Sequence, residues 1–199
     1  MNREFPAADD DLFDLGANWH HNASLHMTHD MWVIYAEGYK QAADKLVEQV
    51  QSGNTSNNFV VYPVIFLYRH FVELRLKEIL KDGYQAAGKR APVPSKHPLN
   101  EHPLMPLWKE CRRIVEEVWP KDEPIPLDSA ERIIGQLEKH DASSFAFRYP
   151  SDKKGQPMLR DLTHVNLVKF SQVIGRLANL LNTLSCGIAQ LLGEEIGGC

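Results

Sequence analysis

The chain has 199 residues, of which 43% are hydrophobic and 24% are charged, and these values are ordinary for a soluble globular protein. The formal net charge of −4 argues against a surface that coats nucleic acid in general, although it leaves room for a local basic groove. The length suits one domain with an appended arm. We expect a polar N-terminal arm over residues 1–28 and a single domain over residues 29–199.

The N-terminal sequence and the cysteines predict a cytoplasmic protein. The first residues are acidic and lack a basic region followed by an apolar core, so they do not resemble a signal peptide. The longest apolar stretch, Phe59 to Leu80, is interrupted by charges and predicts no membrane span. The chain has an odd number of cysteines, and they are widely spaced: Cys111, Cys186 and Cys199. This spacing predicts free thiols in a reducing compartment, without a disulfide framework or a zinc site.

The arm contains four histidines, His20, His21, His26 and His29. No shell of carboxylates or thiolates accompanies them at a ligand spacing, so we expect no dedicated metal site. After the arm, apolar side chains from Met31 onward follow the three-four spacing of an amphipathic helix, which predicts a first helix that Thr28 or Asp30 caps and that ends at about Gln51.

The second predicted helix, over residues 58–82, combines an apolar sequence with several charged side chains. Pro63 lies inside it, so the helix is expected either to start near Tyr62 or to bend at the proline. Gly83 is a predicted stop. Residues 83–103 are rich in glycine, proline, lysine and arginine and predict a long exposed connection.

Three further amphipathic segments predict helices over residues 104–118, 129–140 and 162–192. A proline-containing linker joins the first two, and a loop over residues 141–158 precedes the last. No alternating run is long enough to predict a strand with certainty. The predicted fold is therefore all-α, an up-and-down bundle of about five helices.

Arg69, Glu73 and Lys77 recur every four residues and therefore lie in one row on a helix face. A charge buried without a partner costs several kcal/mol, so two interpretations stay open. The row is either an ion-pair ladder at a helix boundary or part of a polar pocket within the bundle. His70 lies about 100° further around the helix, so only one of Arg69 and His70 can point into such a pocket.

A Phe-Arg-Tyr-Pro segment in the later loop carries a second candidate site. Arg148 offers planar, bidentate donors, and Pro150 favours an extended conformation of Tyr149. In the functional interpretation, this loop is a clamp for a phosphate or a carboxylate. In the structural interpretation, the aromatic side chains pin the loop to the bundle and Arg148 pairs with Glu73.

Arg160 and His164 are four residues apart at the start of the last predicted helix and would share a helix face. Such a pair suits a metal-independent ribonuclease, in which the histidine is the acid or base and the arginine holds the phosphate. The alternative is that these polar residues only cap and solvate the helix start. His102 likewise either contacts a substrate or anchors the start of the helix over residues 104–118.

Four features together resemble the HEPN superfamily. They are the helix sequence FLYRHFVELRLKEIL, the later His102-Pro-Leu-Met-Pro-Leu, the Arg-Tyr-Pro loop and the long last helix. The resemblance covers roughly Met31 to Leu192. It implies a helical-bundle domain, often dimeric, of the kind found in toxin–antitoxin, anti-phage and RNA-processing systems.

In the catalytic members of that superfamily, an arginine, four to six intervening residues and a histidine form a metal-independent ribonuclease site shared across a dimer. In this chain three residues separate Arg160 from His164, and six separate Arg90 from His97. The Arg160–His164 spacing is one residue shorter than the motif of the catalytic members, so the active motif is degenerate in this chain, and Arg160 and His164 are the candidate catalytic pair. Arg90 and His97 have a matching spacing, but they lie in the proline-rich connection with no helix to align them.

We therefore expect a HEPN-like helical protein that binds or cleaves RNA or a nucleotide in a defence, stress or toxin–antitoxin system. It would be a homodimer through a face that includes the last helix, with no metal or other cofactor and no membrane contact. The alternative is a non-catalytic helical interaction module or scaffold for a protein partner. The candidate substrate-binding residues are Arg69, His70, Glu73, His102, Arg148 and Tyr149.

Overall fold

The computed structural model of the chain describes residues 4–25, 30–88, 102–119 and 126–193. It separates into two parts, Met1–Asp30 and Met31–Cys199. In the first part the described residues form short turns and one 3-10 helix, η1 (Trp19–His21). Aspartate side chains shape these turns by accepting nearby backbone N–H groups, as Asp10 does from Ala7 at 2.7 Å.

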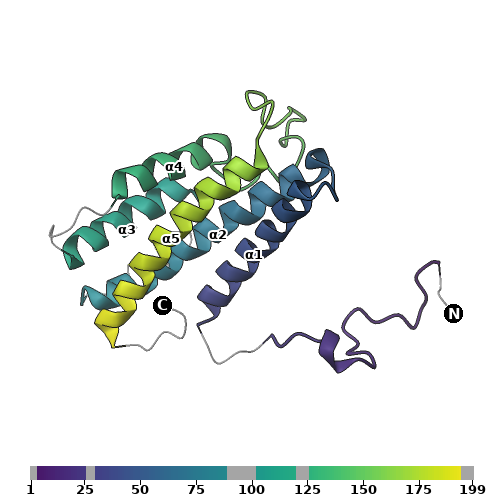
Figure 1. The fold of residues 1–199 in the computed structure, drawn as a ribbon, viewed down its shortest axis with the longest axis horizontal. Helices are drawn as coiled ribbons and strands as arrows, with labels where there is room; N and C mark the ends of the chain where they lie inside the picture. Colours follow the sequence, from purple (N-terminus) through teal and green to yellow (C-terminus); the bar gives the residue numbers. More distant parts are fainter. Residues whose placement is uncertain (1–3, 26–29, 89–101, 120–125, 194–199) are drawn as a thin grey trace. The chain divides into compact units, whose positions relative to one another are not determined.

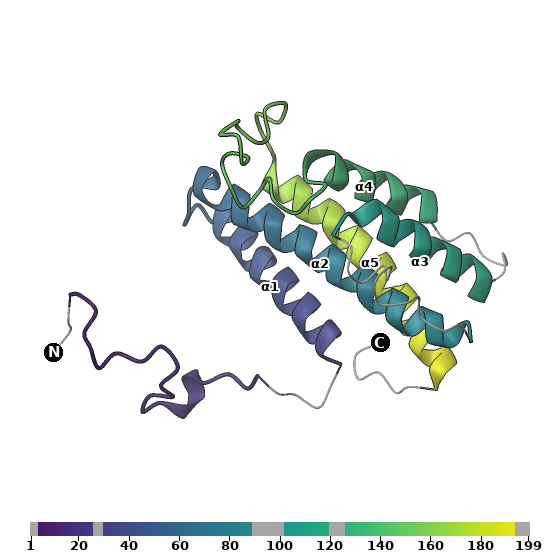
Figure 2. The same cartoon turned by 180° about the vertical axis from the view of Figure 1, so that it is seen from behind.

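The second part is a bundle of five α-helices, and no strand is present among its described residues (Figure 1). Within the pairs α1–α2 and α3–α4 the helices run in opposite directions (Figures 1 and 2). This confirms the predicted all-α fold of about five helices. None of the described helices is both long and apolar enough to cross a bilayer. The helices are α1 (Met31–Gln51), α2 (Asn57–Ala86), α3 (Leu104–Val118), α4 (Leu127–His140) and α5 (Leu167–Leu192).

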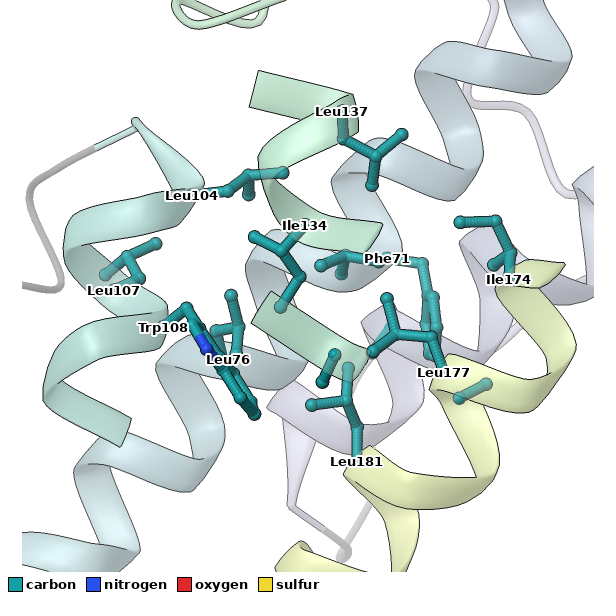
Figure 3. Packing of buried hydrophobic residues seen from close by; sticks show 14 of the residues in the cluster. Phe71, Leu76, Leu104, Leu107, Trp108, Ile134, Leu137, Ile174, Leu177 and Leu181 are labelled. Atoms are coloured by element: carbon teal, nitrogen blue, oxygen red, sulfur yellow. The ribbon is translucent and has the colours of Figure 1, made fainter. Parts of the chain in front are cut away.

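Helix α2 is the centre of the bundle because it packs against α1, α3 and α5. Its apolar side chains surround the helix axis, so nearly every residue from Val64 to Leu80 is buried or partly buried. The facing helices add one apolar stripe each. Figure 3 shows Trp108 of α3 beside Leu76, and Ile134 of α4 and Leu181 of α5 belong to the same buried cluster. Each large apolar side chain buried in this way contributes about 1.5–3 kcal/mol.

The boundaries of α2 differ from the prediction at both ends. The helix begins at Asn57 and includes Pro63, which is exposed. The Phe59 carbonyl, which loses its helical partner to the proline, is also at an exposed residue and can meet water. At the other end the helix continues through Gly83, which is buried. A Cβ atom there would lie 2.8 Å from Ile114 Cγ2, so this glycine allows α3 to pack closely instead of ending the helix.

Helix α5 begins at Leu167, five residues later than predicted. The side chain of Asn166 caps it by accepting the backbone N–H of Lys169 at 3.0 Å. Arg160 and His164 therefore precede the helix, and the prediction that they share one of its faces is wrong.

The cysteines follow the prediction only in part. Cys111 is a free, fully buried thiol that donates to the Leu76 carbonyl at 3.3 Å, and burial raises its pKa. Cys186 is disulfide-bonded, so the prediction of free thiols is wrong for this residue, and Cys199 lies outside the described residues. The cysteines consequently give no support for a reducing compartment.

Candidate binding site

The ionic row of α2 forms a buried polar centre. Arg69 is 1% exposed and Glu73 is 3% exposed. The Arg69 Nη1 group donates to Glu73 Oε2 at 2.9 Å, and Lys77 Nζ donates to Glu73 Oε1, also at 2.9 Å. The row is thus an ion-pair ladder, as one interpretation held, but it lies inside the bundle instead of at its boundary.

Arg69 also joins α2 to segments far away in the sequence. Its Nε donates to the Asp141 carbonyl at 3.0 Å and its Nη2 donates to the His102 carbonyl at 2.8 Å. His102 closes the network, because its Nδ1 lies 3.0 Å from Glu73 Oε1 while its ring stays largely exposed. The guanidinium therefore holds the start of α3 and the end of α4 against α2. These contacts favour the interpretation of His102 as an anchor.

Asp141 connects this polar centre to the aromatic loop, and it was not among the residues predicted from the sequence. Its side chain is buried and its Oδ1 accepts the backbone N–H groups of Phe145 at 2.6 Å and Ala146 at 2.9 Å. Its Oδ2 lies 3.6 Å from Arg69 Nε. The sequence signal for this role is the position of Asp141 directly after a helix, because an aspartate there can accept the backbone N–H groups of the turn that follows. Asp141 thereby fixes the backbone of two residues that shortly precede Arg148.

The electrostatics of the polar centre keep Glu73 ionised. Burial acts to raise the pKa of Glu73, but the hydrogen bonds from Lys77, His102 and Arg69 outweigh burial and hold the pKa below its usual value of 4.5.

His70 lies outside this polar centre, among aromatic side chains. Its ring packs edge-on against Tyr39 at 4.4 Å and stacks on Phe66 at 5.8 Å, and burial lowers its pKa.

Of Arg69 and His70, only the arginine points into the polar centre, as the geometry of a helix requires.

A second buried ionic network was not predicted. Arg75 donates to Glu78 Oε2 at 2.6 Å and to Glu37 Oε1 at 2.8 Å. Ser185 donates its hydroxyl to Glu78 Oε1 at 2.5 Å. These bonds tie α2 to α1 and α5, so we assign the network a structural role.

Two adjoining cavities lie where the loop over residues 141–166 meets the helices. The first, which we call the loop pocket, has a volume of about 560 Å³, within the range of about 300–1,000 Å³ usual for ligand pockets. It is bounded by the loop and by the first half of α2. Its lining residues are Val61, Tyr62, Ala146, Phe147, Arg148, Tyr149, Pro150, Pro157, Met158, Leu159, Leu162, Thr163, His164 and Val165.

The second cavity, the helix pocket, has a volume of about 470 Å³ and lies between α2, α4 and α5. Phe147, Leu162, His164 and Val165 line both cavities and form the wall between them. The other lining residues are Ile65, Ile133, Gln136, Leu137, Lys139, His140, Asn166, Lys169, Phe170, Val173 and Ile174.

No aspartate or glutamate appears among the described residues that line either pocket, although the chain contains 26 acidic residues. The titratable side chains there are basic or neutral. The acidic charge of the chain is concentrated elsewhere, since residues 1–30 hold one arginine and six acidic residues. Residues 31–199 therefore hold 21 lysines and arginines against 20 acidic residues, a formal charge of +1. The net charge of −4 thus comes from residues 1–30, and residues 31–199 are close to neutral.

The Arg148 side chain of the loop pocket lies near three aromatic rings. Its guanidinium carbon lies 5.7 Å from the ring centroids of Phe66, Phe145 and Tyr149. Its Nε donates to the Ser144 carbonyl at 2.5 Å. The other two guanidinium nitrogens make no hydrogen bond or ion pair with a described residue, and Arg148 does not pair with Glu73 as the structural interpretation required. The rings therefore hold an exposed guanidinium with free donors.

Arg160 and His164 are not brought together in one pocket lining. Arg160 is exposed and donates to the Pro157 carbonyl at 3.2 Å and to the Gln156 side chain. His164 lines both pockets. The other spaced pair, Arg90 and His97, lies outside the described residues.

Among the described residues, no group of three or more histidines, cysteines and acidic residues is placed to hold a metal ion. Of the arm histidines, His20 and His21 belong to η1, whereas His26 and His29 lie outside the described residues.

Six of the candidate residues fall into two groups, and His70 and Arg160 belong to neither. Arg69, Glu73 and His102 build the buried polar centre, whereas Arg148, Tyr149 and His164 line the loop pocket. Comparison of the chain with family models, with curated proteins and with solved structures yields no match.

Proposed function

We propose that this HEPN-like bundle binds a nucleotide, free or as part of RNA, in the loop pocket. The observation that carries the proposal is the Arg148 guanidinium, which three aromatic rings hold at an acid-free cavity with two nitrogens unpartnered by described residues. An arginine presented in this way donates in a bidentate manner to a phosphate. Tyr62 and Tyr149, both about half exposed, offer faces on which a base can stack.

The polar centre anchors the loop that lines this pocket. Arg69 bonds the backbone of Asp141, and Asp141 in turn bonds the backbone of Phe145 and Ala146. The loop that presents Arg148 is therefore attached to a buried ionic network, which reduces the entropy lost when a ligand binds. The placement of Arg160 outside the pocket lining favours binding over cleavage as the activity of this site.

Replacing Arg148 with alanine should weaken the binding of adenosine 5′-monophosphate by about 10- to 100-fold. Hydrogen bonds to a charged group contribute about 1.5–3 kcal/mol, and each 1.4 kcal/mol corresponds to a factor of ten. Isothermal titration calorimetry of the full chain measures the dissociation constants. Arg148→Lys should give an intermediate loss, because it keeps the charge without the planar donors.

The matched control is Arg176→Ala, which removes an exposed arginine of α5 that lines neither pocket. Its affinity should equal that of the native chain. An equal loss in Arg148→Ala and Arg176→Ala would show that only net charge matters. Absence of binding to the native chain would overturn the proposal.

A second candidate function is supported by the arm. Its large apolar side chains are exposed, with Leu12 at 95%, Phe13 at 88% and Trp19 at 72%. Large apolar side chains that share one short exposed segment offer apolar surface to a second protein chain. In an interaction module that forms a homodimer, these side chains would contact the second copy of the chain.

Sedimentation velocity over a range of concentrations should then show a dimer for the native chain and a monomer for the full-length variant Leu12→Ser/Phe13→Ser. A native chain that stays monomeric at every concentration would exclude this homodimer.

A further inference from the structure

We infer that the loop pocket and the helix pocket together bind two successive nucleotides of one strand, with the linking phosphodiester beside His164. This inference rests on the proposed function and specifies its ligand as an oligonucleotide of at least two residues. A free mononucleotide would fill the loop pocket first, because Arg148 offers planar donors there and no described arginine lines the helix pocket.

The first observation is the wall that the two pockets share. Phe147, Leu162, His164 and Val165 contribute to both linings, so the cavities are adjacent. A single strand can therefore cross from one cavity to the other. His164 is exposed at this crossing and carries ring nitrogens that can donate to a phosphate oxygen there.

The second observation is the composition of the helix pocket. Ile65, Phe170 and Ile174 contribute apolar surface, and Phe170 adds an aromatic ring. Lys139 and Lys169 are exposed on the same lining and form no ion pair with a described residue. An apolar wall beside cations suits a base with its phosphate, because the base covers the apolar surface and the phosphate meets the lysines. A polyphosphate chain alone would leave the apolar wall exposed to water.

The third observation is that both pockets repeat the same chemistry. Each combines an aromatic side chain with basic side chains, and neither lining contains a described acidic residue. Two neighbouring sites of this kind match the repeat of a nucleic-acid strand, in which bases and phosphates alternate. Single-strand binding sites are built from such stacking surfaces and cationic grooves.

The test compares adenosine 5′-monophosphate, adenosine 5′-diphosphate and 5′-phosphorylated diadenylate on the full chain by isothermal titration calorimetry. The dinucleotide should bind at least about 10-fold more tightly than the monophosphate, a difference of about 1.4 kcal/mol. The double variant Lys139→Ala/Lys169→Ala should lose most of this gain and keep the affinity for the monophosphate. The control Lys45→Ala/Lys109→Ala removes two exposed lysines that line neither pocket and should keep the gain.

Each other outcome has a distinct meaning. If the monophosphate binds but the dinucleotide gains nothing, or keeps its gain in Lys139→Ala/Lys169→Ala, the two-nucleotide site is refuted and the proposed function stands. If the diphosphate gains as much as the dinucleotide, the helix pocket holds phosphate without a base, and the inference is again refuted. If none of the three ligands binds, the proposed function itself fails.

Discussion

Glu73→Ala is expected to lower the free energy of unfolding by about 3–5 kcal/mol, because it leaves buried cations without their counter-charge. Arg69 and Lys77 both donate to this carboxylate, and Arg69 is almost completely buried. A domain of this size has a stability of roughly 5–15 kcal/mol, so the variant would be close to unfolding. Urea denaturation followed by circular dichroism measures the loss.

Glu48→Ala is the control for this substitution, because it removes an exposed glutamate of α1 and should change stability by less than about 0.5 kcal/mol. A loss below about 1 kcal/mol in Glu73→Ala would mean that the polar centre is solvated, contrary to its burial.

Lowering the pH should lower the free energy of unfolding of the native protein, as Glu73→Ala does. The folded-state pKa of Glu73 lies below 4.5, so its contribution to stability is present above pH 4.5 and is lost as the pH falls through the folded-state pKa. The pKa of His70 is lowered from 6.5 chiefly by burial, so protonation of the unfolded chain also favours unfolding below pH 6.5. Glu73→Ala should therefore lose less stability than the native chain below pH 4.5.

Trp108→Ala is expected to lower the free energy of unfolding by about 3–5 kcal/mol through the cavity that it leaves. Trp108 is fully buried and is the largest of the fully buried side chains. It extends from α3 toward Leu76 of α2, with Ile134 of α4 close by (Figure 3). Thermal or urea unfolding monitored by circular dichroism gives the value.

Trp108→Phe provides the matched comparison. The indole Nε1 of Trp108 is buried without a hydrogen-bond partner among the described residues, so phenylalanine removes an unsatisfied donor and loses no bond. We expect this variant to cost clearly less than Trp108→Ala. Equal losses in the two variants would point to a hydrogen bond of Nε1 that the packing does not show.

The local sequence was sufficient to predict most of the helices. Helix α3 runs over Leu104–Val118 as predicted, because the three-four spacing of apolar residues depends only on neighbours along the chain. The same rule failed at the start of α5. Leu162 and Val165 continue the apolar spacing, but they line the two pockets in a non-helical segment, and Asn166 caps the helix only afterwards. Periodicity alone cannot distinguish an apolar residue on a helix face from an apolar residue that lines a pocket in a loop.

The sequence by itself determined the helical class of this protein and the presence of charges within its central apolar helix, since both follow from residue order and helix geometry. Only the tertiary structure decided the partners of those charges. Arg69 meets the carbonyls of His102 and Asp141 from 33 and 72 residues away, and Arg148 is held near Phe66 of α2. Such contacts depend on how the helices pack, which no local pattern encodes, and for this reason the two pockets and their acid-free linings became visible only in the folded chain.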